Sequence, residues 1–313
     1  MMTTIITCPK CGLKQGKKEE CSNCGIIFNK FYQKKKIPKD GFNKPVAEKQ
    51  KPSTLFRFTR ILILLVILFF VSLSTWTTML RTTSWEKPLR VVVYPVNADN
   101  STASAEYISS LKEETFDPVE DFMRDEAERY GIELEDPVIL IQAPEVEQLP
   151  PEPPQGSSIF NVMLWSLRLR WWAYKVDTYN GPAAQVKIFV LYHDPKAFEF
   201  LEHSVGIKKG LVCIVNAYAS WKMRDKDNVI IAHELLHTVG ATDKYNPSTG
   251  FPIFPEGFAE PDKEPLFPQE FAEIMGSRIQ ISDNSLEMPE SLHQAPIGPV
   301  TAQEIKWIEE DGN

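Results

Sequence analysis

Two histidines four residues apart, with a glutamate directly after the first, form a motif that could carry chemistry. The motif is His233-Glu234-Leu235-Leu236-His237. On a helix, residues i and i+4 lie one above the other, so both imidazoles could reach the same metal ion. The glutamate would then stand beside a water polarised by the metal and could take its proton. These groups suit zinc-dependent hydrolysis of a peptide bond, although a surface histidine pair without a metal would show the same spacing.

The residues that follow the second histidine extend the motif. Gly240 stands three positions after His237, and Asp243 stands six positions after it. Glycine tolerates a positive φ, so Gly240 can end the helix and turn the chain back towards the metal. The Asp243 carboxylate is therefore a candidate third ligand.

The extended motif, H-E-x-x-H-x-x-G-x-x-D, resembles that of the metzincin superfamily of zinc metalloproteases. Most members use histidine as the third ligand, and a minority use aspartate, as here. The superfamily also places a methionine turn beneath the metal, and Glu273-Ile274-Met275-Gly276 has the character of such a turn. The resemblance covers about residues 89–310, but only residues 230–245 and Met275 carry specific signal.

The resemblance implies a role for each residue of the site. A catalytic Zn²⁺ would have three protein ligands, namely His233, His237 and Asp243. Glu234 would be the general base that passes a proton to the leaving amine. Met275 would support the histidines without being a ligand. Tyr245 could donate a hydrogen bond to the developing oxyanion, or could pack in the core.

A second zinc-peptidase class offers a different third ligand. Glu256 stands 19 residues after His237, which resembles the gluzincin spacing, and Glu260 is a weaker candidate. Gluzincins bring this glutamate in on a helix, but residues 250–268 contain five prolines, which oppose a sustained helix. Gly240 would also have no role on this interpretation. Asp243 is therefore favoured, with Glu256 near the rim of the cleft.

A hydrophobic segment divides the chain into two parts of opposite charge. Residues 1–60 carry 14 Lys/Arg against 4 Asp/Glu, and the remainder carries 20 against 38. Residues 61–80 contain no charge and would span about 30 Å as a helix, the thickness of a bilayer core. A signal peptide would lie nearer the start, and a buried core helix would not be apolar on every side. A single-pass anchor is expected, with the lysine-rich N-terminus in the cytoplasm and the C-terminal domain outside it, on the periplasmic side of a bacterial inner membrane.

Two C-x-x-C pairs near the N-terminus predict a second, structural Zn²⁺ site. The pairs, nine residues apart, are Cys8 with Cys11 and Cys21 with Cys24. Four thiolates at this spacing can close a tetrahedral site, so residues 5–30 resemble a small zinc ribbon. A redox dithiol would not need two such pairs. The ribbon would serve a protein partner rather than catalysis.

The remaining composition is consistent with this organisation. Residues 31–60 form a basic cytoplasmic linker whose lysines are explained by anionic lipid rather than by nucleic acid. Cys213 is the only cysteine beyond the hydrophobic segment, so no disulfide is expected there, and its apolar neighbours predict a buried core residue.

Residues 88–313 are expected to form an α/β zincin-like catalytic domain, a twisted sheet with an active-site helix. Strands are predicted at 89–96, 137–142, 185–192 and 211–217, and helices at 105–130 (broken at 117–118), 157–177, 225–239 and 301–310. The active-site helix is expected to be capped by Asp225, Asp227 or Asn228, and the last helix by Thr301 with Glu304. Five prolines within residues 143–155 predict a loop.

Two classes of function follow. The first is a membrane-anchored zinc endopeptidase that acts on extracytoplasmic polypeptides. The second is a non-catalytic receptor or scaffold whose zinc fold binds an envelope partner. The presence of Glu234 favours catalysis, since a protein that only binds does not need a general base.

Overall fold

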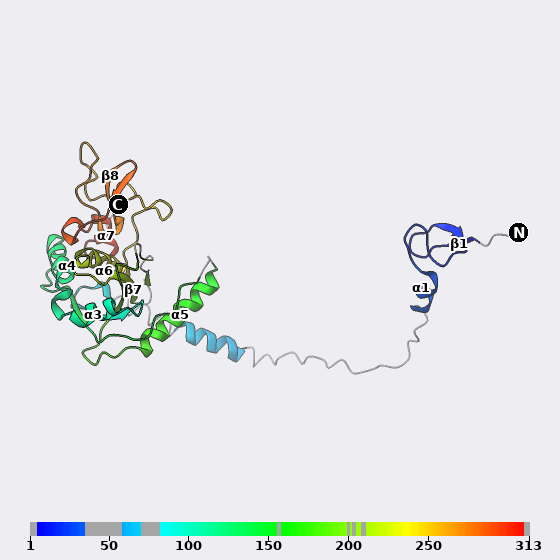
Figure 1. The fold of residues 1–313 in the computed structure, drawn as a ribbon, viewed down its shortest axis with the longest axis horizontal. Helices are drawn as coiled ribbons and strands as arrows, with labels where there is room; N and C mark the ends of the chain where they lie inside the picture. The colour runs from blue at the N-terminus through cyan, green and yellow to red at the C-terminus, as the bar shows by residue number, and fades with distance from the viewer. Residues whose placement is uncertain are drawn as a thin grey trace. The chain divides into compact units, whose positions relative to one another are not determined.

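The chain forms two compact units, Met1–Leu64 and Leu65–Asn313 (Figure 1). The computed structural model describes residues 5–34, 58–69, 82–154, 158–198, 201, 205–207 and 211–309. The greater part of the predicted basic linker 31–60 lies outside these residues.

The N-terminal unit is small and is built around its cysteines. Strand β1 (Ile5–Thr7) pairs antiparallel with β2 (Lys14–Gly16), and α1 (Phe28–Lys34) follows. Each C-x-x-C pair ends in a turn at a glycine, and Gly12 and Gly25 have φ of 76° and 66°. A residue with a Cβ would be strained at both positions, which explains why glycine follows the second cysteine of each pair.

The predicted membrane segment is only partly described. Residues 58–69 are helical, whereas residues 70–80 of the segment 61–80 lie outside the described residues. Within the described part of the chain, no helix is long and apolar enough to cross a membrane.

The larger unit is a mixed α/β domain built on a five-stranded sheet of order β4-β3-β5-β7-β6. The strands are β3 (Leu89–Asn97), β4 (Val138–Gln142), β5 (Val186–His193), β6 (Val205–Ile207) and β7 (Val212–Tyr218). Four of them are parallel, and β6 pairs antiparallel with β7 at the edge. The four parallel strands were predicted from their apolar runs, as expected for strands buried on both faces. The short edge strand β6 was not.

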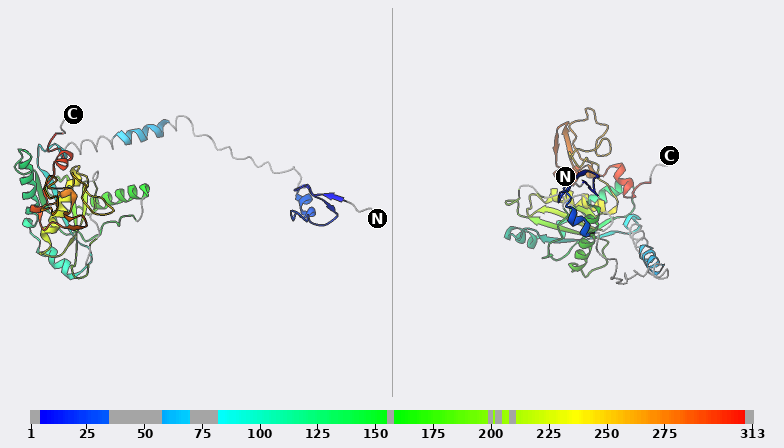
Figure 2. Two further views of the ribbon diagram at one scale, coloured as in Figure 1. Left: turned by 90° about the horizontal axis from the view of Figure 1, so that it is seen from above. Right: turned by 90° about the vertical axis from the view of Figure 1, so that its right-hand side faces the viewer.

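Helices cover both faces of this sheet (Figures 1 and 2). One face packs against α3 (Thr102–Ser110), α4 (Asp117–Arg129), α6 (Arg224–Val239) and α7 (Pro299–Glu304). The other packs against α5 (Ile159–Lys175). Successive residues of a strand point to opposite faces, so Val91 of β3 joins the first core and Val92 the second.

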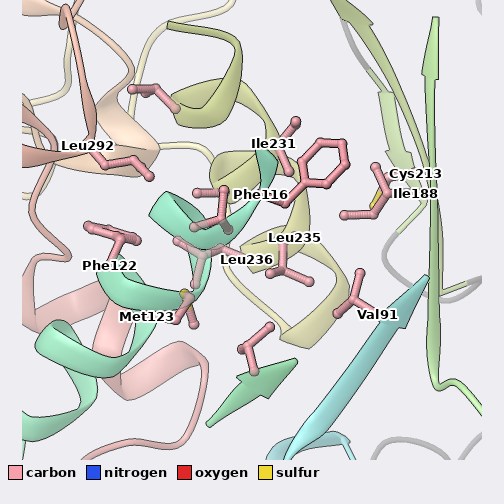
Figure 3. Close-up of a cluster of buried hydrophobic side chains, with 14 of the residues drawn as sticks. Val91, Phe116, Phe122, Met123, Ile188, Cys213, Ile231, Leu235, Leu236 and Leu292 are labelled. Atoms are coloured by element: carbon pink, nitrogen blue, oxygen red, sulfur yellow. The ribbon is translucent and has the colours of Figure 1, made fainter. Parts of the chain in front are cut away.

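The core beneath α6 fixes the position of this helix (Figure 3). Leu235 and Leu236 are fully buried among side chains of the sheet and of α4, including Ile188 and Met123. Cys213 lies in the same cluster with no exposed surface, which confirms its prediction as a core residue.

The predicted caps of two helices are wrong. Helix α6 begins at Arg224, and its N-cap, Met223, makes no side-chain cap bond. Helix α7 begins at Pro299 after Gly298 rather than at Thr301. Thr301 instead donates to the Glu273 carboxylate at 2.6 Å, so the expected capping box does not form.

The C-terminal part between α6 and α7 is mostly irregular. It contains the short helices η2 (Ile274–Gly276) and η3 (Leu292–Gln294) and the antiparallel pair β8 (Ile279–Ser282) and β9 (Ser285–Glu287). A third short helix, η1 (Glu113–Thr115), lies between α3 and α4. The first predicted helix is therefore interrupted at residues 111–116, whereas residues 117–118, where the break was predicted, form the start of α4. Residues 246–272, which include the five prolines, contain no helix.

Candidate metal centres

Helix α6 and the loop after it bring three metal-ligating side chains together. Nε2 of His237 lies 3.1 Å from Asp243 Oδ1, and Nε2 of His233 lies 3.3 Å from the same oxygen. Zinc–nitrogen bonds of about 2.0–2.1 Å at tetrahedral angles separate two ligands by about 3.4 Å. The spacing of these groups therefore fits one zinc ion.

Hydrogen bonds to backbone carbonyls orient both imidazoles. Nδ1 of His233 lies 2.9 Å from the Ile274 carbonyl oxygen, and Nδ1 of His237 lies 2.9 Å from that of Ala241. A carbonyl can only accept, so each Nδ1 carries the proton and each Nε2 keeps its lone pair. Both rings thus turn their coordinating nitrogens to the same point.

Gly240 produces the turn that the sequence predicts. Helix α6 ends at Val239, and Gly240 follows with φ of 126°. A Cβ at this position would stand 2.9 Å from the Glu304 carbonyl oxygen. Only glycine meets both conditions without strain, and the turn returns the chain to the histidines at Asp243.

Residues of α7 hold the loop that carries Asp243. The Glu304 carboxylate accepts from the Thr242 backbone N–H at 2.8 Å and from Lys244 Nζ at 2.7 Å. Lys244 is 3% exposed, so this ion pair is sheltered from water. These contacts fix the residues on both sides of Asp243. Neither Lys244 nor Glu304 was predicted as part of the site, because nothing local in the sequence pairs two residues 60 positions apart.

The turn at Ile274–Gly276, which was predicted as a methionine turn, lies directly against His233. The Ile274 carbonyl that accepts from His233 belongs to η2, and Met275 is fully buried beside it. The Met275 carbonyl accepts from the Lys244 N–H at 2.8 Å, which connects the turn to the loop that carries Asp243. Glu273 holds the turn from the N-terminal side, since its carboxylate accepts from the Gly276 N–H.

The Asp243 carboxylate gives the group a negative charge. Burial raises the pKa of Asp243, but the adjacent side chains of His233 and His237 outweigh it and lower this pKa well below its usual range. Burial lowers the pKa of His237, but the Asp243 carboxylate and the Ala241 carbonyl outweigh it and raise this pKa. Asp243 is therefore an anion at neutral pH and offers charge as well as an oxygen to a metal.

Two further predicted residues lie close to this group. Glu234 follows His233 on α6 and is 5% exposed. Burial raises the pKa of Tyr245, and so do the nearby charges of Asp243 and Glu234. Tyr245 is therefore a neutral hydroxyl within the electrostatic reach of both carboxylates, able to donate a hydrogen bond.

Glu256 is not part of the group. Its side chain is exposed in the turn 254–257, and the three-residue cluster among the described residues contains Asp243 instead. Glu260 accepts from the Glu270 N–H and pairs with Lys263, away from the histidines. The prolines of this segment keep it from forming the helix that would bring either glutamate to the metal.

The N-terminal cysteines form the other cluster among the described residues that could hold a metal, and it is consistent with a zinc ribbon with a structural metal. Sγ of Cys8 lies 3.6 Å from Sγ of Cys24, and Sγ of Cys11 lies 3.5 Å from Sγ of Cys21. The backbone N–H of Leu13 lowers the pKa of Cys11 to about 6. The backbone N–H of Ile26 lowers the pKa of Cys24, but burial and the neighbouring thiols outweigh it and raise this pKa to about 12. Four sulfurs this close could coordinate one cation, and the set fits Zn²⁺.

Comparison of the sequence with protein-family models gave no match, and comparison with curated proteins gave none either. The two clusters are therefore interpreted from their residues and geometry alone.

Replacing Cys21 by serine is expected to lower the zinc content by one ion per chain and to unfold the N-terminal unit. Zinc binding by such small sites supplies about 10–16 kcal/mol of folding free energy, and the core of Cys8, Cys21 and Phe28 is too small to replace it. Metal analysis and limited proteolysis would measure both effects. Cys213→Ser is the matched control and should keep the full zinc content. A Cys21→Ser protein with unchanged zinc and an intact N-terminal unit would contradict the ribbon.

Proposed function

We propose that this protein is a membrane-anchored zinc endopeptidase that hydrolyses extracytoplasmic proteins or peptides. The observation that carries the proposal is the convergence of His233, His237 and Asp243 on one point, with Glu234 beside them on the same helix. The support is chemical, since the site has three zinc ligands and a general base, the parts that water-mediated peptide hydrolysis requires.

In this proposal His233, His237 and Asp243 hold the zinc ion through two nitrogens and one carboxylate oxygen. When bound there, zinc supplies Lewis-acid polarisation of a water and of the scissile carbonyl. Glu234 takes the proton from the attacking water and delivers it to the leaving amine. Tyr245 donates a hydrogen bond to the oxyanion that develops on the carbonyl.

The extended motif and the methionine turn support a metzincin-like arrangement rather than a gluzincin one. Gly240 turns the chain at the helix end, Asp243 lies at the histidines, and Met275 is buried next to the Ile274 carbonyl that orients His233. The antiparallel edge strand β6 beside α6 also has backbone groups to which an extended substrate could pair.

The cellular placement follows from the charge division and the apolar segment. We propose that residues 61–80 anchor the protein in the bilayer, that residues 1–60 face the cytoplasm, and that the α/β domain works outside it, on the periplasmic side of a bacterial inner membrane. The zinc ribbon would then bind a cytoplasmic protein partner.

A non-catalytic scaffold that binds an envelope partner is the alternative, and one experiment separates the two. The full-length protein, purified in detergent, is incubated with a peptide library before and after removal of metal by a chelator. We expect cleavage that chelation abolishes and that added Zn²⁺ restores. Full zinc occupancy without cleavage of any peptide would contradict the peptidase and favour the scaffold.

A further inference from the structure

Helix α5 carries a second apolar face that points away from the domain. The residues of this face recur at helical spacing, and the most exposed of them have between 60% and 78% of their surface accessible: Ile159, Phe160, Met163, Leu167, Trp171 and Tyr174. At 100° per residue, Phe160, Met163, Leu167, Trp171 and Tyr174 fall within a sector of about 80°. They form one continuous stripe, which we call the outer stripe of α5.

The opposite side of the same helix already packs on the sheet. Its buried residues, Leu169, Trp172 and Ala173, contact the second core through side chains such as Phe189. Packing on the sheet therefore explains the apolar residues on the buried side of α5, but not the exposed apolar residues of the outer stripe. The helix extends away from the sheet in Figure 1 and in the left view of Figure 2. A contiguous exposed apolar surface of this kind marks an interaction site.

The charges on α5 indicate which partner fits the stripe. Arg168 and Arg170 are exposed and flank it on either side, and Lys175 follows near the helix end. Residues 158–176 contain no acidic side chain, although the chain after residue 60 has 38 Asp/Glu against 20 Lys/Arg. Apolar side chains bordered by arginine, with Trp171 and Tyr174 between them, suit the interface of an anionic bilayer. Stripe-to-stripe pairing with a second copy would instead bring like charges together.

The start of the domain keeps the domain near the membrane of the proposed function. Trp85 is buried, and its Nε1 donates to the Ile305 carbonyl at 2.7 Å, so the fold is already anchored at this residue. The apolar segment ends at Leu80, five residues earlier. Five residues reach at most about 18 Å, so a segment that spans the bilayer would hold the domain at its surface.

We propose that α5 inserts its outer stripe into the leaflet on the side of the catalytic domain, to a depth of about 5–10 Å, with Arg168 and Arg170 at the lipid headgroups. This inference rests on the membrane anchor of the proposed function. The domain then has two attachments to the bilayer, which fix its orientation at the membrane surface.

Lipid-phase photolabelling of the full-length protein tests the insertion. The protein is reconstituted in vesicles of phosphatidylcholine and phosphatidylglycerol, labelled with an apolar carbene reagent that partitions into acyl chains, and mapped by peptide mass spectrometry. We expect label in residues 61–80 and in residues 159–174. The triple variant Phe160→Glu, Met163→Glu, Leu167→Glu should lose the second label by at least about tenfold and keep the first, since a buried charge opposes insertion.

A matched variant controls for the three added charges. Leu149→Glu, Ile253→Glu, Phe254→Glu changes three exposed apolar residues outside α5 and should keep both labels. Label in 61–80 without label in 159–174 would overturn the insertion of α5 and leave the anchor intact. Absence of label from both segments would overturn the anchor itself. If residues 159–174 instead formed cross-links between the α5 helices of two protein molecules in the vesicles, the stripe would be assigned to a second copy. That result would overturn the lipid proposal.

Discussion

Replacing Glu234 by glutamine is expected to reduce peptide cleavage by at least about 100-fold and by as much as about 10⁴-fold, with the zinc content unchanged. Glutamine keeps the size of the side chain but cannot accept a proton from the attacking water, and a positioned general base contributes about 10²–10⁴ to the rate. Zinc should stay because Glu234 is not among the three residues that converge on the metal position. Steady-state cleavage of a quenched peptide and metal analysis of the same sample would measure both quantities.

Glu256→Gln is the matched control for this substitution. It makes the same isosteric change at a glutamate that is exposed and lies outside the three-residue group, so activity should stay within about twofold of the original protein. The peptidase proposal would fail if Glu234→Gln cleaved as fast as the original protein. Loss of zinc together with activity would instead give Glu234 a role in holding the metal.

Removing the third ligand is expected to have the second large effect. In Asp243→Ala the site keeps two neutral nitrogens and loses its only anionic oxygen, so zinc affinity should fall by more than about 100-fold. Loss of an outer-shell partner alone costs about 10–100-fold, and a direct ligand must exceed that. The measurement is zinc content after dialysis against a weak chelator, with the zinc of the cysteine cluster as the internal reference.

Glu256→Ala provides the comparison that separates the two zinc-peptidase arrangements. We expect it to retain zinc and activity, because its carboxylate is exposed while that of Asp243 lies 3.1 Å and 3.3 Å from the two histidine nitrogens. If Glu256→Ala lost both and Asp243→Ala lost neither, the metzincin-like assignment would be wrong and the gluzincin-type site would replace it.

The ligand-bearing segment was predictable because its determinants are local. The i, i+4 relation of His233 and His237 follows from helix geometry, and the helix forms because its apolar residues recur at helical spacing. Gly240 was predicted to end the helix with a positive φ, and it does so at 126°. The four parallel strands were likewise visible as apolar runs, since a strand buried on both faces leaves no room for polar alternation.

What holds this site together was not predictable, because each contact joins positions far apart in the chain. His233 takes its orientation from the Ile274 carbonyl, 41 residues later. The loop carrying Asp243 is fixed by Glu304, a residue that sequence alone predicts to cap its own helix. The sequence around Thr301 and Glu304 is compatible with a capping box and equally with contacts to distant segments. Only the packing of α7 against the loop that carries Asp243 decides between these two outcomes.

The sequence by itself therefore determined the chemistry available at the two candidate metal centres: which side chains could coordinate, which glutamate could take a proton, and where glycine must turn the chain. Tertiary structure alone decided that Asp243 rather than Glu256 lies at the histidines, and that one face of α5 stays uncovered while the other packs on the sheet. The reason is physical. Residue type and spacing fix local backbone geometry, whereas the position of a distant carboxylate depends on the packing of the whole domain.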